Sequence, residues 1–325
     1  AKFGATNWVT LGGISFQPSE IAKICYIFAG SATLERLFRR RNLALFIVLT
    51  GVCIGLLGLM SDFGTAAIFF VTFLVIAYLR SGDAATLALI CGGAAFGAGI
   101  IVQFKPYILS RFAAWGHAWE AASGSGYQQT RTMSAVASGG LFGAGPEEAW
   151  LKYVGAANTD QVFGVVSEEF GLLLALCAAA AVILLGIYAL RAAGRSRSSF
   201  YAIAACATAA MLVFQTTLNV LGSVDLLPLT GVTFPFVSNG GSAMMGAWGL
   251  LAFLKATADI SLAAGGAILG VTASCLVSAV YLYRCFRRSY AQLPDTGDTP
   301  KSFSATAREL LKIAVPITVS STILS

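Results

Sequence analysis

Residues 127–171 read YQQTRTMSAVASGGLFGAGPEEAWLKYVGAANTDQVFGVVSEEFG, and the rest of the chain is organised around this stretch. It opens on polar residues, passes through a loop rich in glycine, and ends on Glu168 and Glu169 just before an apolar run. Asp160 lies at the expected water-facing edge of a membrane span, where a carboxylate is costly and usually functional. We therefore expect Asp160 to take part in chemistry. The loop glycines are Gly139, Gly140, Gly143 and Gly145.

The composition places the chain in a membrane. Hydrophobic residues make up 57% of it and charged residues 11%, too few charges to cover a soluble globule. We expect an all-α fold, a polytopic bundle of transmembrane helices. The net charge of +6 does not indicate nucleic acid, because the basic residues cluster at the ends of apolar runs. His117 is the only histidine, so a histidine-based zinc site could be built only around it. The seven cysteines form no CxxC pair, and we expect them to be small buried hydrophobic residues rather than metal ligands.

Apolar runs of the length that crosses a bilayer, about 20 residues, recur along the chain. Basic residues follow the first, third, fifth and seventh runs, which predicts a cytoplasmic location for those ends. The opposite face then receives the loop of about 104–160 and the segment 222–242. The runs are 18–36, 43–60, 63–80, 84–103, 163–190, 199–221 and 243–258.

The character of the chain changes after residue 258. An eighth apolar run, 261–283, precedes three arginines, and a span there would place them outside. Either this run does not cross, or a junction near residue 259 joins pieces of incompatible topology. At the other end, the chain begins at Ala1 without a methionine, so we expect its beginning to be missing.

Two acidic motifs open apolar runs. In the first, 17–20, proline suits a first helical turn and Glu20 suits a helix N-terminus, which favours capping. Glu20 and Lys23 could equally form an ion pair that lines a cavity, and both interpretations stay open. In the second, 62–65, we expect Asp62 to cap the following helix.

The acids near residue 160 have a plain structural interpretation as well. Asn158 or Thr159 could cap the next helix, with Asp160 stabilised in its first turn by the helix dipole. The same dipole would keep Asp160 ionised, as a general base requires. Glu168 and Glu169 would lie about 12 Å further along that helix, inside the membrane, so at least one should line a polar interior.

A second polar group follows. Gln215 and Asn219 share one helical face, and the prolines and glycines of 228–242 predict non-helical backbone that is buried or lines a wet cavity. Free N–H groups at 240–242 could hold an anion such as pyrophosphate, and Lys152 is a second candidate for binding phosphate.

Taken together, these strings resemble the SEDS family of peptidoglycan glycosyltransferases, of the FtsW, RodA and SpoVE type. The resemblance covers residues 1 to about 258 and implies that the first three of ten spans are absent. It also implies that Asp160 corresponds to the family's essential aspartate. The chain departs from the family pattern at Asn7, where arginine is usual, and at Gln161 and Val162. The matching strings are Gly4-Ala5 with Trp8, Gln17-Pro18-Ser19-Glu20 with Lys23, Asp62 to Ala66, Tyr127-Gln128, the loop glycines, Thr159-Asp160 with Phe163, Glu168 to Gly171, Gln215 with Asn219, and Leu227 to Ser242.

Residues from about 261 to 325 look different and resemble part of a polysaccharide flippase of the MATE and MurJ type. Our hypothesis for domain organisation is a SEDS-like region, 1–258, and a flippase-like fragment, 259–325, joined by gene fusion or by an assembly artefact. A polar linker lies near 290–305.

The resemblance implies polymerisation of lipid II into glycan strands at the outer face of the bacterial cytoplasmic membrane. Asp160 would act as general base in an inverting transfer, with undecaprenyl pyrophosphate leaving. A class B penicillin-binding protein is the implied protein partner, beside membrane lipids. The alternatives are a flippase for the same precursor and a scaffold for division proteins. A role for a divalent cation, and the choice among division, elongation and sporulation, stay open. The residues expected to bind substrate are Lys152, Glu20, Lys23, Tyr127, Gln128, Glu168, Glu169, Gln215, Asn219, Ser238, Gly240, Gly241 and Ser242.

Overall fold

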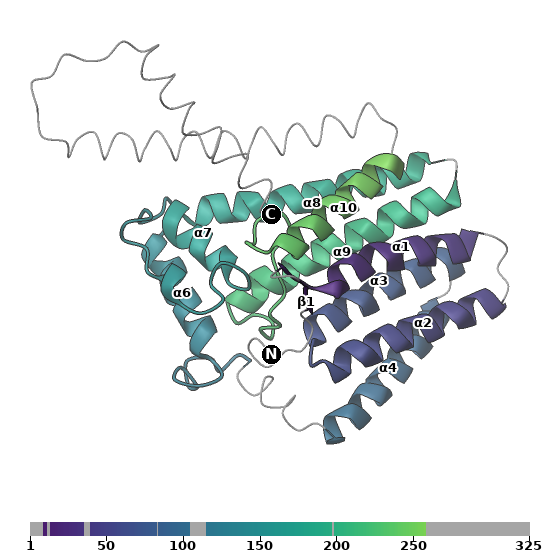
Figure 1. Ribbon diagram of the computed structural model, residues 1–325, viewed down its shortest axis with the longest axis horizontal. Coiled ribbons are helices and arrows are strands. Elements are labelled where there is room, and N and C mark those ends of the chain that lie inside the picture. The colour runs from purple at the N-terminus through teal and green to yellow at the C-terminus, as the bar shows by residue number, and fades with distance from the viewer. Residues whose placement is uncertain are drawn as a thin grey trace, which may run out of the picture. The chain divides into compact units, whose positions relative to one another are not determined.

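The computed structural model describes residues 9–11, 14–35, 40–82, 84–104, 115–196 and 198–257 (Figure 1). All of them belong to one compact unit. The eighth apolar run and the flippase-like segment lie outside the described residues. The proposed division of the chain near residue 259 therefore stays a prediction.

The described residues are mainly helical, as the composition predicted, and most helices begin and end within a few residues of the apolar runs. One difference is a short antiparallel hairpin before the first helix, in which Val9 pairs with Phe16. The elements are β1 Val9–Leu11, β2 Ile14–Phe16, α1 Pro18–Glu35, α2 Arg40–Leu59, α3 Phe63–Ser81, α4 Ala84–Phe104, α6 Tyr127–Gly139, η1 Leu151–Tyr153, α7 Val162–Phe170, α8 Leu172–Arg195, α9 Ser199–Ser223 and α10 Gly241–Thr257.

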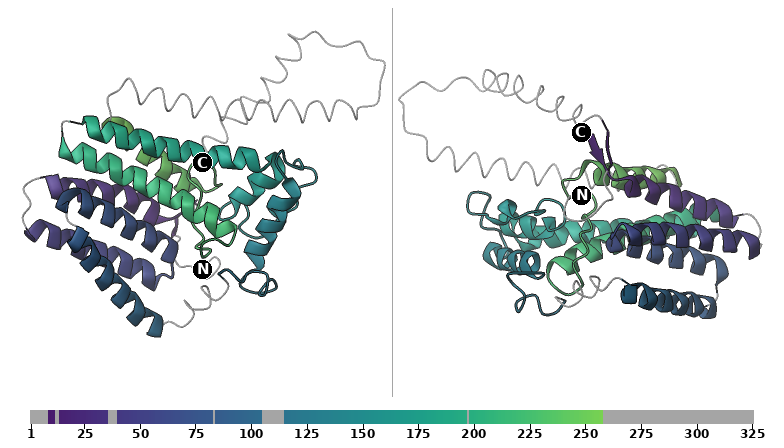
Figure 2. Two further views of the ribbon diagram at one scale, coloured as in Figure 1. Left: turned by 180° about the vertical axis from the view of Figure 1, so that it is seen from behind. Right: turned by 60° about the horizontal axis from the view of Figure 1, so that its bottom comes forward.

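Helix α9 is the centre of the helix bundle formed by α1, α2, α3, α8, α9 and α10 (Figures 1 and 2). It packs against α8, α3, α1 and α10. Within the described part of the chain, α8 and α9 are the two helices long and apolar enough to cross a membrane by length and composition. The buried share of the apolar window is 72% in α9 but 28% in α8, so α8 presents most of its apolar surface outward. Large buried side chains of the core include Tyr26, Phe46, Ile68, Phe69 and Met211.

The run 163–190 is two helices, so the prediction of one continuous span there is wrong. The chain breaks at Gly171, whose φ of 98° and ψ of 153° suit glycine rather than other residues. Glu168 and Glu169 lie in α7, which packs against α6 as well as α8. The sequence argument that placed Glu168 and Glu169 deep in the membrane depended on one continuous helix, so it no longer holds.

Residues 115–171, here called the cap, contain α6, η1 and α7 and adjoin one end of the bundle (Figure 1). The glycine-rich loop contacts the backbone at the end of α7 and the start of α8 directly. The N–H of Ala144 donates to the carbonyl of Glu168 at 2.8 Å, and the N–H of Leu172 donates to the carbonyl of Gly140 at 2.9 Å. A Cβ on Gly143, where φ is 83°, would lie 2.4 Å from the Glu169 carbonyl oxygen. Glycine is required at residue 143 because the loop backbone and the α7 backbone lie too close together for a side chain between them.

Asp225 joins the cap to the end of α9. One carboxylate oxygen accepts hydrogen bonds from the N–H of Gly116 at 3.1 Å and from Nε2 of Gln129 at 3.0 Å. The other accepts from the N–H of Ala118 at 3.2 Å. The sequence analysis did not single out Asp225, although an acid that follows a long apolar helix is a recognisable signal.

Candidate active site

Asp160 lies in a tight turn that begins at Ala156, a residue with a left-handed φ of 64°. The carbonyl of Ala156 accepts hydrogen bonds from the N–H groups of Thr159 at 3.2 Å and Asp160 at 3.0 Å. It also accepts from the Thr159 hydroxyl at 3.1 Å. The turn therefore fixes the backbone on the N-terminal side of Asp160.

The sequence prediction of a helix cap at Asn158 or Thr159 is wrong. Helix α7 begins at Val162, its N-cap residue is Gln161, and no side chain caps it. Asp160 precedes the helix rather than lying in its first turn. Its position is determined by the turn and by contacts with a distant part of the chain.

Three consecutive carbonyl groups, those of residues 158–160, accept hydrogen bonds from the segment that includes α9 and the start of α10. In chain order, the donors are the N–H of Asn239 at 2.8 Å, the hydroxyl of Ser238 at 2.6 Å and Nδ2 of Asn219 at 2.9 Å. The same Nδ2 donates to the carbonyl of Val232 at 2.7 Å. Two loops far apart in sequence are thus bound together at Asp160.

The Asp160 carboxylate lies beside Gly231 and is half-buried. A Cβ on Gly231, which has a φ of 69°, would come within 3.3 Å of the Asp160 Oδ2 atom. Gly231 itself is exposed, so the carboxylate lies at an accessible part of the surface. The next residue, Gln161, is fully buried and its Oε1 accepts from the Thr132 hydroxyl at 2.9 Å.

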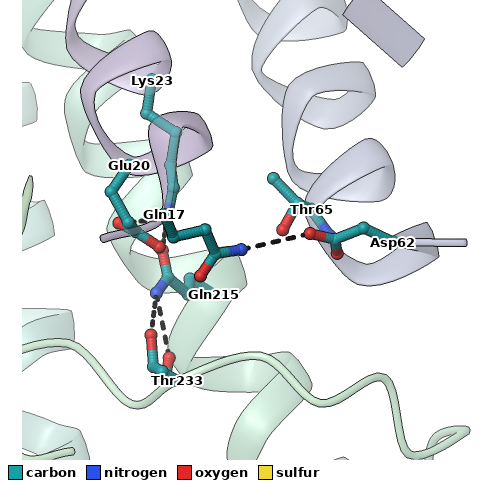
Figure 3. Close-up of polar contacts among 7 residues, drawn as sticks. All are labelled: Gln17, Glu20, Lys23, Asp62, Thr65, Gln215 and Thr233. Atoms are coloured by element: carbon teal, nitrogen blue, oxygen red, sulfur yellow. Dashed lines mark hydrogen bonds and ion pairs between the residues drawn. The ribbon is translucent and has the colours of Figure 1, made fainter. Parts of the chain in front are cut away.

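A buried polar chain connects α1 to the same region (Figure 3). Lys23 Nζ lies 2.8 Å from Glu20 Oε2, which confirms the ion pair, and donates to Gln215 Oε1 at 3.0 Å. Gln215 Nε2 then donates to the carbonyl of Thr233 at 2.9 Å. Because Gln215 and Asn219 are four residues apart, they hold the carbonyls of Thr233 and Val232 from one face of α9.

Asp62 caps α3 as predicted. Its Oδ1 accepts from the N–H of Thr65 at 3.1 Å, and its Oδ2 accepts from Nε2 of Gln17 at 3.2 Å (Figure 3). This second contact ties the start of α1 to the start of α3. The two acidic motifs therefore meet at one end of the bundle.

Glu168 is buried and its two oxygens accept from the N–H groups of Trp150 at 3.1 Å and Leu151 at 2.9 Å. These contacts hold the start of η1, and we assign Glu168 a structural role. Glu169 is half-buried, and this burial raises the pKa of its carboxyl above the ordinary value of 4.5. Glu168 also raises that pKa, whereas Lys152 lowers it.

Lys152, Tyr127 and Gln128 belong to the cap. Lys152 Nζ donates to the carbonyl of Pro146 at 2.6 Å and lies 5.3 Å from the centre of the Tyr153 ring. Gln128 Nε2 donates to the carbonyl of Gly155 at 3.3 Å, next to the Asp160 turn. Tyr127 is exposed, with Arg131 above its ring at 5.2 Å.

The start of α10 lies against the Asp160 turn. Helix α10 begins at Gly241. The N–H of Gly240 donates to the carbonyl of Ser238 at 3.0 Å, so the prediction of a free N–H group at residue 240 is wrong. The rest of the expected anion site follows directly on the residues that bind the carbonyls of 158–160. The structure brings Asp160, Asn219, Ser238, Gln215, Lys23 and Glu20 into one connected network. Sequence analysis included Gly231 and Thr233 in the string 227–242 but assigned neither of them a role.

The fold and site together define a helical membrane protein that holds the half-buried Asp160 carboxylate where the cap meets the bundle. Residues 1–260 match the model of the FtsW/RodA/SpoVE family, described as a cell cycle protein. The chain belongs to this family, and the resemblance seen in the sequence is confirmed.

Curated relatives agree with this assignment. The chain is 32% identical over 261 residues to a probable peptidoglycan glycosyltransferase FtsW of Coxiella burnetii, covering 74% of this chain and 68% of the relative. It is 31% identical to the FtsW of Escherichia coli O157:H7, covering 74% and 61%. It is 30% identical to the peptidoglycan glycosyltransferase RodA of Mycobacterium bovis, covering 77% and 57%. The chain thus spans 57% to 68% of the length of these relatives.

Solved structures share the fold. A chain of a peptidoglycan synthase complex, described as coordinating polymerization and crosslinking, aligns with a TM-score of 0.61 and 26% identity, covering 78% of this chain and 73% of that one. The rod shape determining protein RodA of Thermus thermophilus aligns with a TM-score of 0.52 and 25% identity, covering 78% and 68%.

Proposed function

We propose that this chain is a peptidoglycan glycosyltransferase that polymerises lipid II, with Asp160 as its general base. Family membership and the names of the relatives support the reaction class. The observation that carries the role of Asp160 is its placement. Its carboxylate is half-buried at an accessible surface, while its backbone is held on both sides.

The reaction balances with one carboxylate. Asp160 takes the proton of the acceptor sugar's 4-hydroxyl, and that oxygen forms a bond to the anomeric carbon of the donor. The bond from the anomeric carbon to the pyrophosphate oxygen breaks, and undecaprenyl pyrophosphate leaves with the electron pair. A single displacement of this kind inverts the anomeric configuration.

The leaving pyrophosphate needs stabilisation because negative charge accumulates on it. The first turn of α10, 241–243, offers backbone N–H groups and the positive end of the helix dipole. This turn follows the residues that contact the Asp160 turn, so donor and base would lie close together. Lys152 is a second candidate for this anion, after release from the Pro146 carbonyl.

The site end of the bundle faces the outside of the bacterial cytoplasmic membrane in this proposal. Helix α8 begins beside the cap and, with 24 residues, carries Arg195 about 36 Å away. Arginines at a helix end favour the cytoplasm, so the cap lies outside. Seven spans belong to this proposal, with α8, Leu172–Arg195, as the fifth in place of the run 163–190. A class B penicillin-binding protein as the crosslinking partner belongs to it as well.

Cysteine labelling in intact cells tests the orientation. Asn158→Cys, at the exposed cap side, should react with a membrane-impermeant maleimide added outside. Gly194→Cys, exposed at the other end of α8, should react only after the cells are opened. The reverse pattern would exclude an extracytoplasmic site.

The function itself is tested with Asp160→Asn in purified protein supplied with lipid II. We expect the rate of glycan formation to fall by at least about 10²-fold, the usual contribution of a general base. Lipid II binding should be retained. Glu120→Gln is the matched control, because its side chain in the same cap is 81% exposed and contacts only His117 among the contacts described.

Glycan formation by Asp160→Asn at the parental rate would end the proposal. Transport of lipid II that continues in both variants without any glycan product would instead favour the flippase. A scaffold predicts no difference between the two variants in either assay.

A further inference from the structure

Ser238 was expected to bind substrate, yet its hydroxyl is fully engaged with the protein backbone. It accepts the N–H of Phe234 at 2.7 Å and donates to the carbonyl of Thr159 at 2.6 Å. The residue is 2% exposed. A substrate could reach this hydroxyl only if both bonds were broken.

We propose that Ser238 is a positioning residue that fixes the turn carrying the general base. This inference rests on the proposed function of Asp160. The hydroxyl links residues 79 positions apart, so it couples the position of Asp160 directly to the loop before α10.

Little freedom remains for Asp160 once these contacts are made. Its N–H donates to Ala156 at 3.0 Å, its carbonyl accepts from Asn219 at 2.9 Å, and the preceding carbonyl accepts from Ser238. Gly231 lies beside the carboxylate on one side. The backbone that carries the carboxylate is therefore held on both sides of Asp160.

Position matters here because a general base must lie within about 2.6 to 3.2 Å of the hydroxyl whose proton it takes. A displacement of about 1 Å can cost up to about 10²-fold in rate. Removal of the Ser238 hydroxyl leaves the Thr159 carbonyl without its donor and frees one side of the turn. The chemical step should slow, while substrate affinity, which does not involve Ser238, should persist.

The test is a steady-state comparison of Ser238→Ala with the parent protein on lipid II. We expect kcat to fall about tenfold with KM unchanged. The matched control is Ser167→Ala, because Ser167 is also fully buried but its hydroxyl donates within its own helix, to the Phe163 carbonyl at 2.7 Å. This control should keep the parental kcat, and thermal unfolding of both variants should show that they are folded at the assay temperature.

Combination with Asp160→Asn separates the possible roles. If Ser238 acts through the Asp160 carboxylate, addition of Ser238→Ala to Asp160→Asn leaves the residual rate unchanged. A further fall by the same factor, or a raised KM in Ser238→Ala, would overturn the positioning role. A parental kcat in Ser238→Ala together with a large loss in Asp160→Asn would overturn this inference and leave the proposed function intact. A parental rate in Asp160→Asn would overturn both.

Ser238→Cys provides a second variant if Ser238→Ala does not fold. The thiol occupies nearly the same place but is a weaker hydrogen-bond donor than the hydroxyl. Its kcat should fall between those of the parent and Asp160→Asn, again with unchanged KM. A parental kcat in this variant would also count against the proposal.

Discussion

The bundle and the cap hold their backbones in place by different means. In the bundle, apolar side chains from several helices pack around α9, and the Glu20–Lys23 pair is enclosed among them. In the cap, glycine backbones contact other backbones directly, and Glu168 accepts from two backbone N–H groups. Asp225, after the end of α9, likewise accepts from several donors of the cap. The difference teaches that the apolar bundle supplies stability, whereas the cap supplies a fixed place for a polar group at the water boundary.

The largest expected effect tests the bundle. Lys23→Met leaves the Glu20 carboxylate buried without its cation, and the loss of one partner of a buried pair costs about 3 to 5 kcal/mol. We expect the free energy of unfolding in detergent to fall by that amount. The double variant Glu20→Gln with Lys23→Met should recover most of it, because no buried charge is then left alone. A single variant as stable as the parent would show that water reaches this pair.

An intermediate effect tests the cap. Gly143→Ala places a methyl group 2.4 Å from the Glu169 carbonyl oxygen at a φ of 83°. We expect a loss of about 3 kcal/mol from backbone strain and overpacking combined. Gly82→Ala, at the end of α3, is the control, since its φ is 62° but no atom lies within 4 Å of the added Cβ. Gly82→Ala should lower the free energy of unfolding by only about 1 to 2 kcal/mol. Equal shifts in thermal unfolding would mean that the loop does not interlock with α7.

The smallest effect concerns Glu169 and depends on pH. Because burial raises its pKa in the folded state, the folded chain binds the proton more tightly than the unfolded chain. The contribution of the Glu169 carboxyl to stability is therefore fully present below its unfolded pKa of 4.5. It is lost as pH rises through the raised pKa of the folded state. Glu169→Gln should raise the unfolding temperature slightly at pH 7, with the gain vanishing below pH 4.5. A gain that grows on acidification would contradict the assigned direction.

The helices could be read from the sequence because each apolar run is long and the helical pattern needs only neighbouring residues. Pro18 and Asp62 likewise revealed their helix starts, since caps are local. The break at Gly171 could not be read, because the apolar pattern continues across it and its cause is the contact with the glycine-rich loop.

For the candidate site too, the sequence predicted some features and could not predict others. Asp160 and Asn219 were singled out as polar residues in or beside apolar runs, and Ser238 as part of the string 227–242 that resembles the family. Their roles were not apparent, because nothing local indicates that Ser238 donates to a carbonyl 79 residues earlier. Asp225 was missed, and the place of Gly231 beside the Asp160 carboxylate was not foreseen, because these contacts exist only after the chain folds.

The sequence by itself determined that this chain is a helical membrane protein of the FtsW/RodA/SpoVE family, and it identified the acid at residue 160. Composition and the lengths of the apolar runs can be read directly along the chain, so no three-dimensional information was needed for them. Only the tertiary structure decided how that acid is held, because its turn is bound by Asn219, Ser238 and Asn239, which reach it from the far side of the fold.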